Sequence, residues 1–199
     1  MNHIKLGECT DISTGLVLKR KVANRTDKKK YSYKAITLRS LEQDGWMNEE
    51  FFDKFKSSEE LEERYLTQIG DIIIRLSSPY TAIAVQESQV GIVIPSLCAI
   101  IRNKSEEIVP GYLAFMLNSD IMKKEYLRFS LGATIPVIRM SDLKETEIPL
   151  LTLEKQNKIV DVSDLIIREK KLCHQLLESK ELYYKGITNK IILGGTKNE

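Results

Sequence analysis

Histidine and cysteine are scarce in this sequence. Only two histidines occur in 199 residues, His3 and His174, and the three cysteines, Cys9, Cys98 and Cys173, lie far apart without a C-x-x-C pair. A histidine-based catalytic triad and a histidine-rich metal site both need more of these residues. An odd, dispersed set of cysteines supports neither a disulfide framework nor a zinc site. We therefore expect free thiols and no bound metal.

Motifs for nucleotide chemistry and for membrane insertion are also missing. The sequence has no G-x-x-x-x-G-K-[ST] phosphate loop, no G-x-G-x-x-G fingerprint and no G-x-S-x-G elbow. It lacks the N-P-P-[YF] or D-P-P-[YF] run with which amino-methyltransferases hold a flipped base. No apolar run reaches the ~18 residues of a membrane span, and no apolar signal-peptide core follows the first residues. We expect a cytoplasmic protein without cofactors.

Two short runs, at 169–171 and 178–180, resemble the E-x-K element of nucleases. Both fall in a stretch that is predicted to form one long helix, whereas the nuclease element belongs in a strand beside a second carboxylate. Glutamate and lysine in such a helix are better explained as its solvent-exposed face. We therefore expect no catalytic residue in this chain.

The net charge of +2 hides a strong separation of charge along the chain. From Met1 to Ser40, ten lysines and arginines face three acids, a net charge of +7. From Leu41 to Asp71, ten acids face three bases, a net charge of −7. A segregated basic segment can neutralise phosphates and release their counterions. A solvated loop with compensating charges is the alternative, and the overall balance argues against a protein that coats any polyanion.

The first 150 residues alternate between strand-like and helix-like patterns. A short opening element, residues 4–12, is closed by a turn at Gly15. Alternating or β-branched runs predict strands at 31–38, 72–74, 82–86 and 91–101, the last interrupted by Pro95. Apolar residues and helix caps predict helices at 57–65, 110–117 and 119–131. This order predicts the α/β (α+β) class, with a mixed sheet and peripheral helices.

The composition changes after Pro149. Residues 153–193 contain no proline and a single glycine, Gly186. Apolar residues recur there about every 3.5 positions, as in a coiled-coil seam, although Glu169 and Lys180 interrupt it. The stripe consists of Ile159, Val162, Ile166, Leu172, Cys173, Leu176, Tyr183 and Ile187. A long helix with such a stripe needs a partner, which is a second copy, another subunit or its own domain.

Several motifs of the sequence occur in the same order in a known family. They are Ile4–Glu8, Ile12–Gly15, Tyr31–Ile36, Gly70–Arg75, Pro110–Leu113, Leu117–Ser119, Gly132–Leu143, Ile148–Pro149 and Leu153–Ile159. In this pattern the chain resembles, in half-length form, the specificity (S) subunits of type I restriction-modification systems. Two segments depart from the family: Leu150 and Leu151 follow Pro149 where a second proline is common, and residues 77–80 replace a glycine-containing turn.

The resemblance implies a target-recognition domain at residues 1–150 and a conserved-region helix at residues 151–199 for dimerisation and subunit docking. A usual specificity subunit carries two such units, so the half-length form is expected to pair with another copy as a homodimer. The pair would recognise a split target in double-stranded DNA, with one half-site for each domain. Methyltransferase subunits, and in some systems a restriction subunit, would supply the chemistry, so the chain itself is not expected to be an enzyme.

The resemblance also indicates where DNA is contacted. In the family, base recognition comes from loop side chains that reach the groove edges. The candidates here are Arg75, Ser77, Ser78, Tyr80, Thr81, Thr134 and Arg139. The candidates for phosphate contacts are Lys19, Arg20, Lys21, Arg25, Lys28, Lys29 and Lys30. For Tyr80, packing inside the domain is the stronger expectation.

A different class of protein remains as the alternative hypothesis. The long helix could dock a partner while the domain never contacts DNA, as in a protein–protein interaction module. Binding of duplex DNA by the chain together with its methyltransferase subunit distinguishes the two hypotheses.

Overall fold

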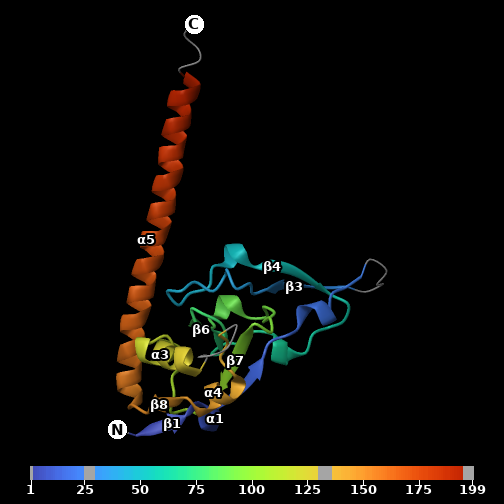
Figure 1. The fold of residues 1–199 in the computed structure, drawn as a ribbon, viewed down its shortest axis with the longest axis vertical. Helices are drawn as coiled ribbons and strands as arrows, with labels where there is room; N and C mark the ends of the chain where they lie inside the picture. The colour runs from blue at the N-terminus through green and yellow to red at the C-terminus, as the bar shows by residue number, and fades with distance from the viewer. Residues whose placement is uncertain (1, 25–29, 130–135, 195–199) are drawn as a thin grey trace. The chain divides into compact units, whose positions relative to one another are not determined.

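The computed structural model describes residues 2–24, 30–129 and 136–194. The chain divides into two compact units, Met1–Asp161 and Val162–Glu199. The first unit holds the strands and the short helices, while one long helix begins in the first unit and forms the second (Figure 1). Among the described residues, no helix has both the length and the apolar composition for crossing a membrane.

A four-stranded antiparallel sheet forms the centre of the first unit. Its strand order is β2 (Thr10–Thr14), β7 (Cys98–Asn103), β5 (Ile72–Arg75) and β6 (Ala82–Ala84). Isoleucine dominates the two inner strands, and Ile73 of β5 lies opposite Ile100 of β7 on one side and Ile83 of β6 on the other. β-Branched side chains pack well on a pleated surface that is buried.

Two further strand pairs complete the sheets. β1 (His3–Lys5) pairs with β8 (Glu147–Pro149), and this pairing joins the start of the first unit to a segment just before the long helix. β3 (Tyr31–Ala35) pairs with β4 (Asp53–Ser57) to form a two-stranded ribbon. All of these ladders are antiparallel, and parallel pairing among the described residues is limited to isolated bridges.

Four short helices belong to the first unit. They are α1 (Leu6–Cys9), α2 (Pro110–Leu117), α3 (Asp120–Phe129) and α4 (Met140–Glu145). Pro110 occupies the first turn of α2, where its missing N–H has no intrahelical partner to lose. The predicted α/β (α+β) class is confirmed by this combination of antiparallel sheets, short helices and a long C-terminal helix. The described sheets are antiparallel, however, and not mixed as predicted.

The central sheet is buried on both faces, because alternate side chains of a strand point to opposite sides. Ile72 and Ile74 belong to a large cluster that includes Leu113 of α2 and Leu143 of α4. Ile73 belongs instead to a second cluster on the other face. Burial on both faces explains why three consecutive isoleucines form this strand.

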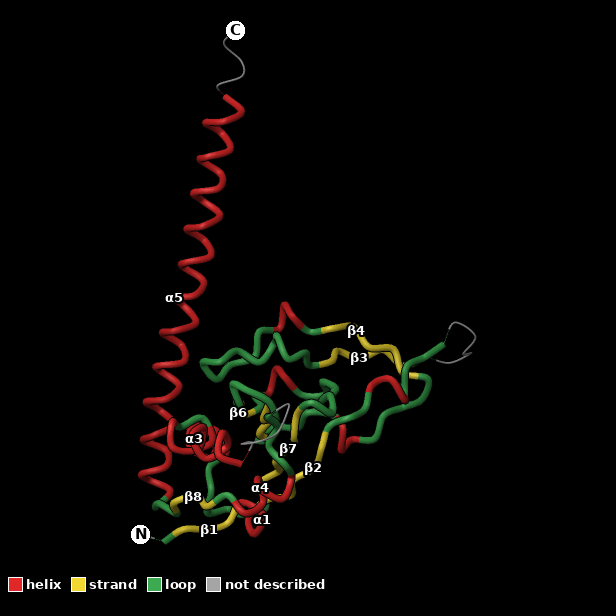
Figure 2. The backbone as a smooth tube through the Cα atoms, viewed as in Figure 1, coloured by secondary structure: helices red, strands yellow, loops and turns green. Residues whose placement is uncertain are grey.

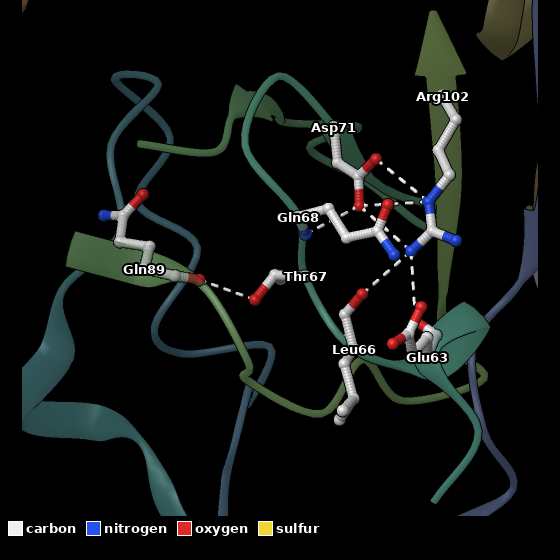
Figure 3. A network of polar contacts seen from close by, with 7 residues as sticks. All are labelled: Glu63, Leu66, Thr67, Gln68, Asp71, Gln89 and Arg102. Atoms are coloured by element: carbon white, nitrogen blue, oxygen red, sulfur yellow. Dashed lines mark hydrogen bonds and ion pairs between the residues drawn. The ribbon is translucent and has the colours of Figure 1, made fainter. Parts of the chain in front are cut away.

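A polar network holds the start of β5 (Figure 3). Nε of Arg102 on β7 donates to Oδ1 of Asp71 over 3.0 Å, and the N–H of Gln68 donates to the same carboxylate over 2.9 Å. The Arg102 guanidinium also donates to the carbonyl of Leu66. Gly70 makes the sharp turn into the strand with a φ of 80°, a backbone conformation that few other residues adopt. This network explains the Gly-Asp pair that the sequence places before the isoleucine run.

The long helix α5 (Leu153–Gly194) begins against the first unit. Gln156 is fully buried there, accepting from the N–H of Val109 over 2.9 Å and donating to the carbonyl of Glu107 over 2.7 Å. A Cβ atom on Gly111 would lie only 3.0 Å from the side chain of Val160 on α5. Glycine at this position therefore permits the close approach of α2 and α5. The first two turns of α5 therefore belong to the first unit.

Two predictions about local structure are wrong. Residues 57–65 form no α-helix: Ser57 ends β4 and only Glu63–Tyr65 makes a 3-10 turn. Leu61 is buried and its N–H is bound by the hydroxyl of Tyr33 on β3, and the crowded glutamates at 59–63 disfavour a helix by like-charge repulsion. The strand predicted at 91–101 begins only at Cys98. Val93 and Pro95 instead form isolated bridges to other segments, and the N–H of Cys98 donates to the Pro95 carbonyl in a turn.

Candidate nucleic-acid interface

The turn between β5 and β6 carries five of the candidate base-recognising residues. Arg75 ends β5 half-buried, and its Nε donates to Oγ of Ser77 over 3.1 Å. The N–H of Arg75 donates to the carbonyl of Thr81 over 2.9 Å, and the N–H of Tyr80 donates to that of Ser77 over 3.0 Å. The Ser78–Pro79 peptide inside this turn is cis. Residues 75–81 thus form a compact, hydrogen-bonded turn that contains no glycine.

The candidate residues of this turn divide into an inner and an outer group. The side chains of Tyr80 and Thr81 are 2% and 0% exposed, and the Tyr80 ring packs on Tyr126 of α3. Ser78 is exposed, and Arg75 and Ser77 are partly exposed. In this structure, the side chains that reach the surface of the turn are therefore those of the outer group.

The turn is held from two sides. Oδ1 of Asn118, at the end of α2, accepts from the N–H of Ala82 over 2.9 Å, and its Nδ2 donates to the Ala82 carbonyl over 2.6 Å. On the other side, the N–H of Ile138 donates to the carbonyl of Leu76 over 2.8 Å. A rigid scaffold of this kind can present loop side chains in a defined geometry.

The segment that bears Arg139 lies beside the same turn. Val137 forms an antiparallel bridge with Ser77, and Arg139 is exposed two residues further on, at the start of α4. The structure therefore brings the Arg75 and Arg139 segments together, although more than sixty positions separate them in the sequence. The other candidate from this region, Thr134, lies outside the described residues.

The candidate phosphate contacts are only partly described. Lys19 and Arg20 are exposed in a 3-10 turn, and Lys30 is exposed at the start of the ribbon. Lys21 is half-buried and forms an ion pair with Glu59, so part of its charge is already compensated. Arg25, Lys28 and Lys29 lie outside the described residues.

Three lysines of the β3–β4 ribbon were not among the candidates. Lys34 of β3 and Lys54 and Lys56 of β4 are all exposed, and Lys34 lies directly opposite Lys54. Sequence reasoning missed the last two because they stand in the segment whose net charge is −7. The alternation of Lys with Phe55 in Asp-Lys-Phe-Lys-Ser is the signal that would have found them, because period-two alternation places both lysines on one strand face.

The apolar stripe of α5 is exposed along the second unit. The exposed fractions of Val162, Leu176 and Tyr183 are 57%, 55% and 66%. The helix is continuous through this whole stretch (Figure 2). Of the predicted seam residues, Ile159 differs, because it is half-buried against the large cluster of the first unit. Among the three cysteines, which are all free, Cys173 on this helix is exposed and the other two are buried.

A sequence profile described as the type I restriction modification DNA specificity domain matches residues 1–179. The chain belongs to this family. The match spans the domain with its β5–β6 turn and most of α5, and it confirms the resemblance inferred from the sequence motifs. No curated protein sequence matches the chain significantly.

Solved structures of specificity subunits share the fold of this family member. The HsdS subunit of Thermoanaerobacter tengcongensis gives a TM-score of 0.60 at 17% identity, covering 96% of this chain and 47% of that one. The type I S subunit of M. genitalium gives 0.56 at 14% identity, covering 93% and 44%. A chain from a study of assembly and conformational transition of the type I R-M system gives 0.59 at 18% identity, covering 94% and 43%. The specificity-domain chain thus spans less than half the length of these solved chains.

Proposed function

We propose that this chain is a DNA sequence-specificity subunit of a type I restriction-modification system. Its domain, residues 1–150, binds one half of a split target in double-stranded DNA, and the chain recruits methyltransferase subunits to that site in the cytoplasm. The observation that carries the proposal is the family match over residues 1–179, which includes both the domain and most of α5. The methyltransferase subunits, and a restriction subunit where the system has one, carry the cofactors and perform the chemistry.

Base recognition is assigned to the surface around the β5–β6 turn. Arg75, Ser77, Ser78 and Arg139 offer guanidinium and hydroxyl groups at or near the surface, on two segments that a bridge holds together. Arginine is suited to bidentate hydrogen bonding with guanine in the major groove, and a hydroxyl group can form a hydrogen bond with either base of a pair. Buried Tyr80 and Thr81 would act by fixing the turn rather than by touching bases.

Phosphate contacts are assigned to the basic N-terminal segment, with exposed Lys19, Arg20 and Lys30 as its described members. These contacts position the domain without selecting a sequence, because all sequences share the phosphate backbone. They also make binding depend on salt, because each neutralised phosphate releases counterions.

Dimerisation is assigned to the exposed stripe of α5 from Val162 onward. The whole helix α5, with 42 residues, extends over about 63 Å. An apolar stripe on such a helix is stabilised when a second helix covers it. Two copies related by a two-fold axis would recognise an inverted repeat, with the paired helices setting the separation of the half-sites.

The test is to map methylated positions in the DNA of a host that carries this chain and its partner methyltransferase subunit. We expect methylation at a split sequence whose two halves form an inverted repeat. A matched host carrying the methyltransferase subunit alone should lack that pattern. If the pattern is the same with and without this chain, the specificity role is wrong. A methyltransferase complex that contains the chain and yet binds no duplex would favour the alternative, a protein–protein interaction module.

A further inference from the structure

The β3–β4 ribbon has two chemically different faces. Tyr33 and Phe55 lie opposite each other on the inner face, within a cluster that includes buried Ala35 and Val93. The outer face carries Ser32, Lys34, Lys54 and Lys56, and all four are exposed. Asp53, the one acid on these two strands, falls on the inner side by the alternation of the strand. The outer face is therefore purely basic and hydroxylic.

The hydrogen bonding of the ribbon places two of these lysines close together. The carbonyl of Lys34 accepts from the N–H of Val93 over 2.9 Å, so the backbone of Lys34 points away from β4. Lys34 and Lys54 consequently form a non-hydrogen-bonded pair, the type in which Cα atoms are about 4.5 Å apart. The backbone of Lys56 likewise points away from its partner strand, β3, since its carbonyl accepts from the N–H of Ala23. Like charges directly opposite each other on adjacent strands destabilise the pairing.

Within the part of the chain that the structure describes, none of these three lysines forms an ion pair. Some lysines elsewhere in the same unit do have acidic partners: Lys5 pairs with Glu145 over 2.6 Å, and Lys158 pairs with Glu154 over 2.6 Å. The ribbon thus retains a repulsive lysine pair that the fold does not compensate. A bound polyanion would remove that repulsion.

We infer that the outer face of the β3–β4 ribbon is a further phosphate-contacting surface for duplex DNA, formed by Lys34, Lys54 and Lys56. This inference rests on the proposed function and adds a site to it. Residues two apart in a strand are separated by roughly 6.6 Å, and a duplex carries one negative charge per about 1.7 Å of its axis. Three ammonium groups on flexible stems can therefore each meet a different phosphate, and the hydroxyl of Ser32 can donate beside them.

The test uses the complex of this chain with its methyltransferase subunits. Lys34, Lys54 and Lys56 are replaced together by Gln, and binding to target and scrambled duplexes is titrated at several salt concentrations. Because each bound copy of the variant neutralises about three fewer phosphates, the slope of log affinity against log salt should become shallower by about 2.7 for each copy of the chain on the duplex. Between ~50 and ~200 mM salt, the unaltered complex should then lose about 40-fold more affinity than the variant complex for each bound copy. The loss should be equal for the two duplexes.

A matched variant separates this effect from net charge. Replacing Lys124, Lys144 and Lys155 by Gln removes three charges from exposed positions outside the ribbon, and none of these lysines forms an ion pair with another described residue. This variant should keep the unaltered salt slope. If it changes the slope as much as the ribbon variant does, the effect is one of total charge and the ribbon is not a contact surface.

A single charge reversal provides the folding control. Lys34→Glu places a carboxylate opposite Lys54, so the ribbon should be at least as stable as the unaltered protein in a thermal melt. Its affinity for both duplexes should nevertheless fall. A stable Lys34→Glu variant that binds like the unaltered complex overturns the inference.

The outcomes also distinguish this inference from the proposed function. If the unaltered complex binds target and scrambled duplexes equally, sequence specificity is wrong, but the salt slope on either duplex still decides the ribbon contacts. If the ribbon variant loses affinity for the target alone, its lysines recognise sequence and the phosphate assignment is overturned. If the unaltered complex binds no duplex, both proposals are wrong.

Discussion

The rings of Tyr80 and Tyr126 meet edge to face, with centroids 5.7 Å apart and planes inclined by 63°. Tyr80 has a φ of 58°, a left-handed conformation that is uncommon for a residue with a large side chain. Tyr80 is nevertheless only 2% exposed, so the buried aromatic contact compensates for the backbone conformation. A local strain beside exposed Ser78 and half-exposed Arg75 is therefore maintained by packing beneath the turn.

Tyr80→Ala tests this packing role. Removing a buried aromatic ring should lower the free energy of unfolding by about 3–5 kcal/mol, because a cavity remains where the ring contacted Tyr126. Ser78→Ala, in the same turn but exposed, should change stability by no more than about 0.5 kcal/mol. Urea unfolding measures both. A Tyr80→Ala protein as stable as Ser78→Ala would contradict the packing role.

Arg75→Ala tests base recognition by the β5–β6 turn. Loss of a bidentate contact with a base costs about 1–3 kcal/mol of discrimination, so the ratio of target to scrambled affinity should fall by roughly 5- to 150-fold. Ser77→Ala should have a smaller effect in the same direction, because Ser77 Oγ accepts from Arg75 Nε and orients it. Equal loss of affinity for both duplexes in the Arg75 variant would remove the base-recognising assignment.

Asp71→Ala should be strongly destabilising. Asp71 is 2% exposed, and its loss leaves the partly buried guanidinium of Arg102 without its carboxylate. Breaking a buried pair from one side costs about 3–5 kcal/mol. The double change Asp71→Ala with Arg102→Ala should cost less than the sum of the two single changes. Additive effects in thermal melts would show that the pair contributes no coupling.

Stability should decline in alkali because of Cys98. Burial raises the pKa of this thiol from 9.0 to about 12, with the charge of Arg75 opposing the shift. Between pH 9 and about 12, the Cys98 thiol is therefore protonated in the folded state and largely deprotonated in the unfolded state. The corresponding stability is fully present below pH 9 and is lost as pH rises toward 12, by up to about 1.4 kcal/mol per pH unit.

The measurement is urea unfolding under reducing conditions at several pH values from 8 upward, with Cys98→Ala as the comparison. The alanine variant is expected to be less stable at pH 8 because of the cavity, and its disadvantage should shrink as pH rises. A stability difference that stays constant with pH would mean that the Cys98 thiol does not titrate differently on folding.

Leu176→Lys tests the dimer seam of α5. Leu176 lies on the predicted stripe, and a charge there should shift the protein from dimer to monomer, because an unpaired buried charge is costly. Leu177→Lys is the matched control: it makes the same change at a 62% exposed position about 100° further around the helix. Light scattering at micromolar concentration should show a monomer for the first variant and a dimer for the second. An unaltered protein that is strictly monomeric would exclude the symmetric model.

Local patterns were sufficient for several elements. The helix start at Pro110 and the long helix from Leu153 follow from features that neighbouring residues supply, namely a proline at the first turn and apolar periodicity. The Ile72–Arg75 strand follows from a β-branched run. The error at 57–65 arises partly from the crowded glutamates, which are visible in the sequence. It arises also from the contact of Leu61 with Tyr33 of a distant strand, which no local pattern reports.

The sequence by itself determined the family motifs, several of the strands and helices, and the long helix with its apolar stripe, because these depend on residue identity and short-range spacing. Only the tertiary structure decided that Lys34 faces Lys54, that Val137 lies beside Ser77, and that Thr81 is buried. Strand register and turn packing are set by contacts between residues far apart in the chain. A candidate interface in a loop-rich domain is therefore defined by those contacts more than by charge along the sequence.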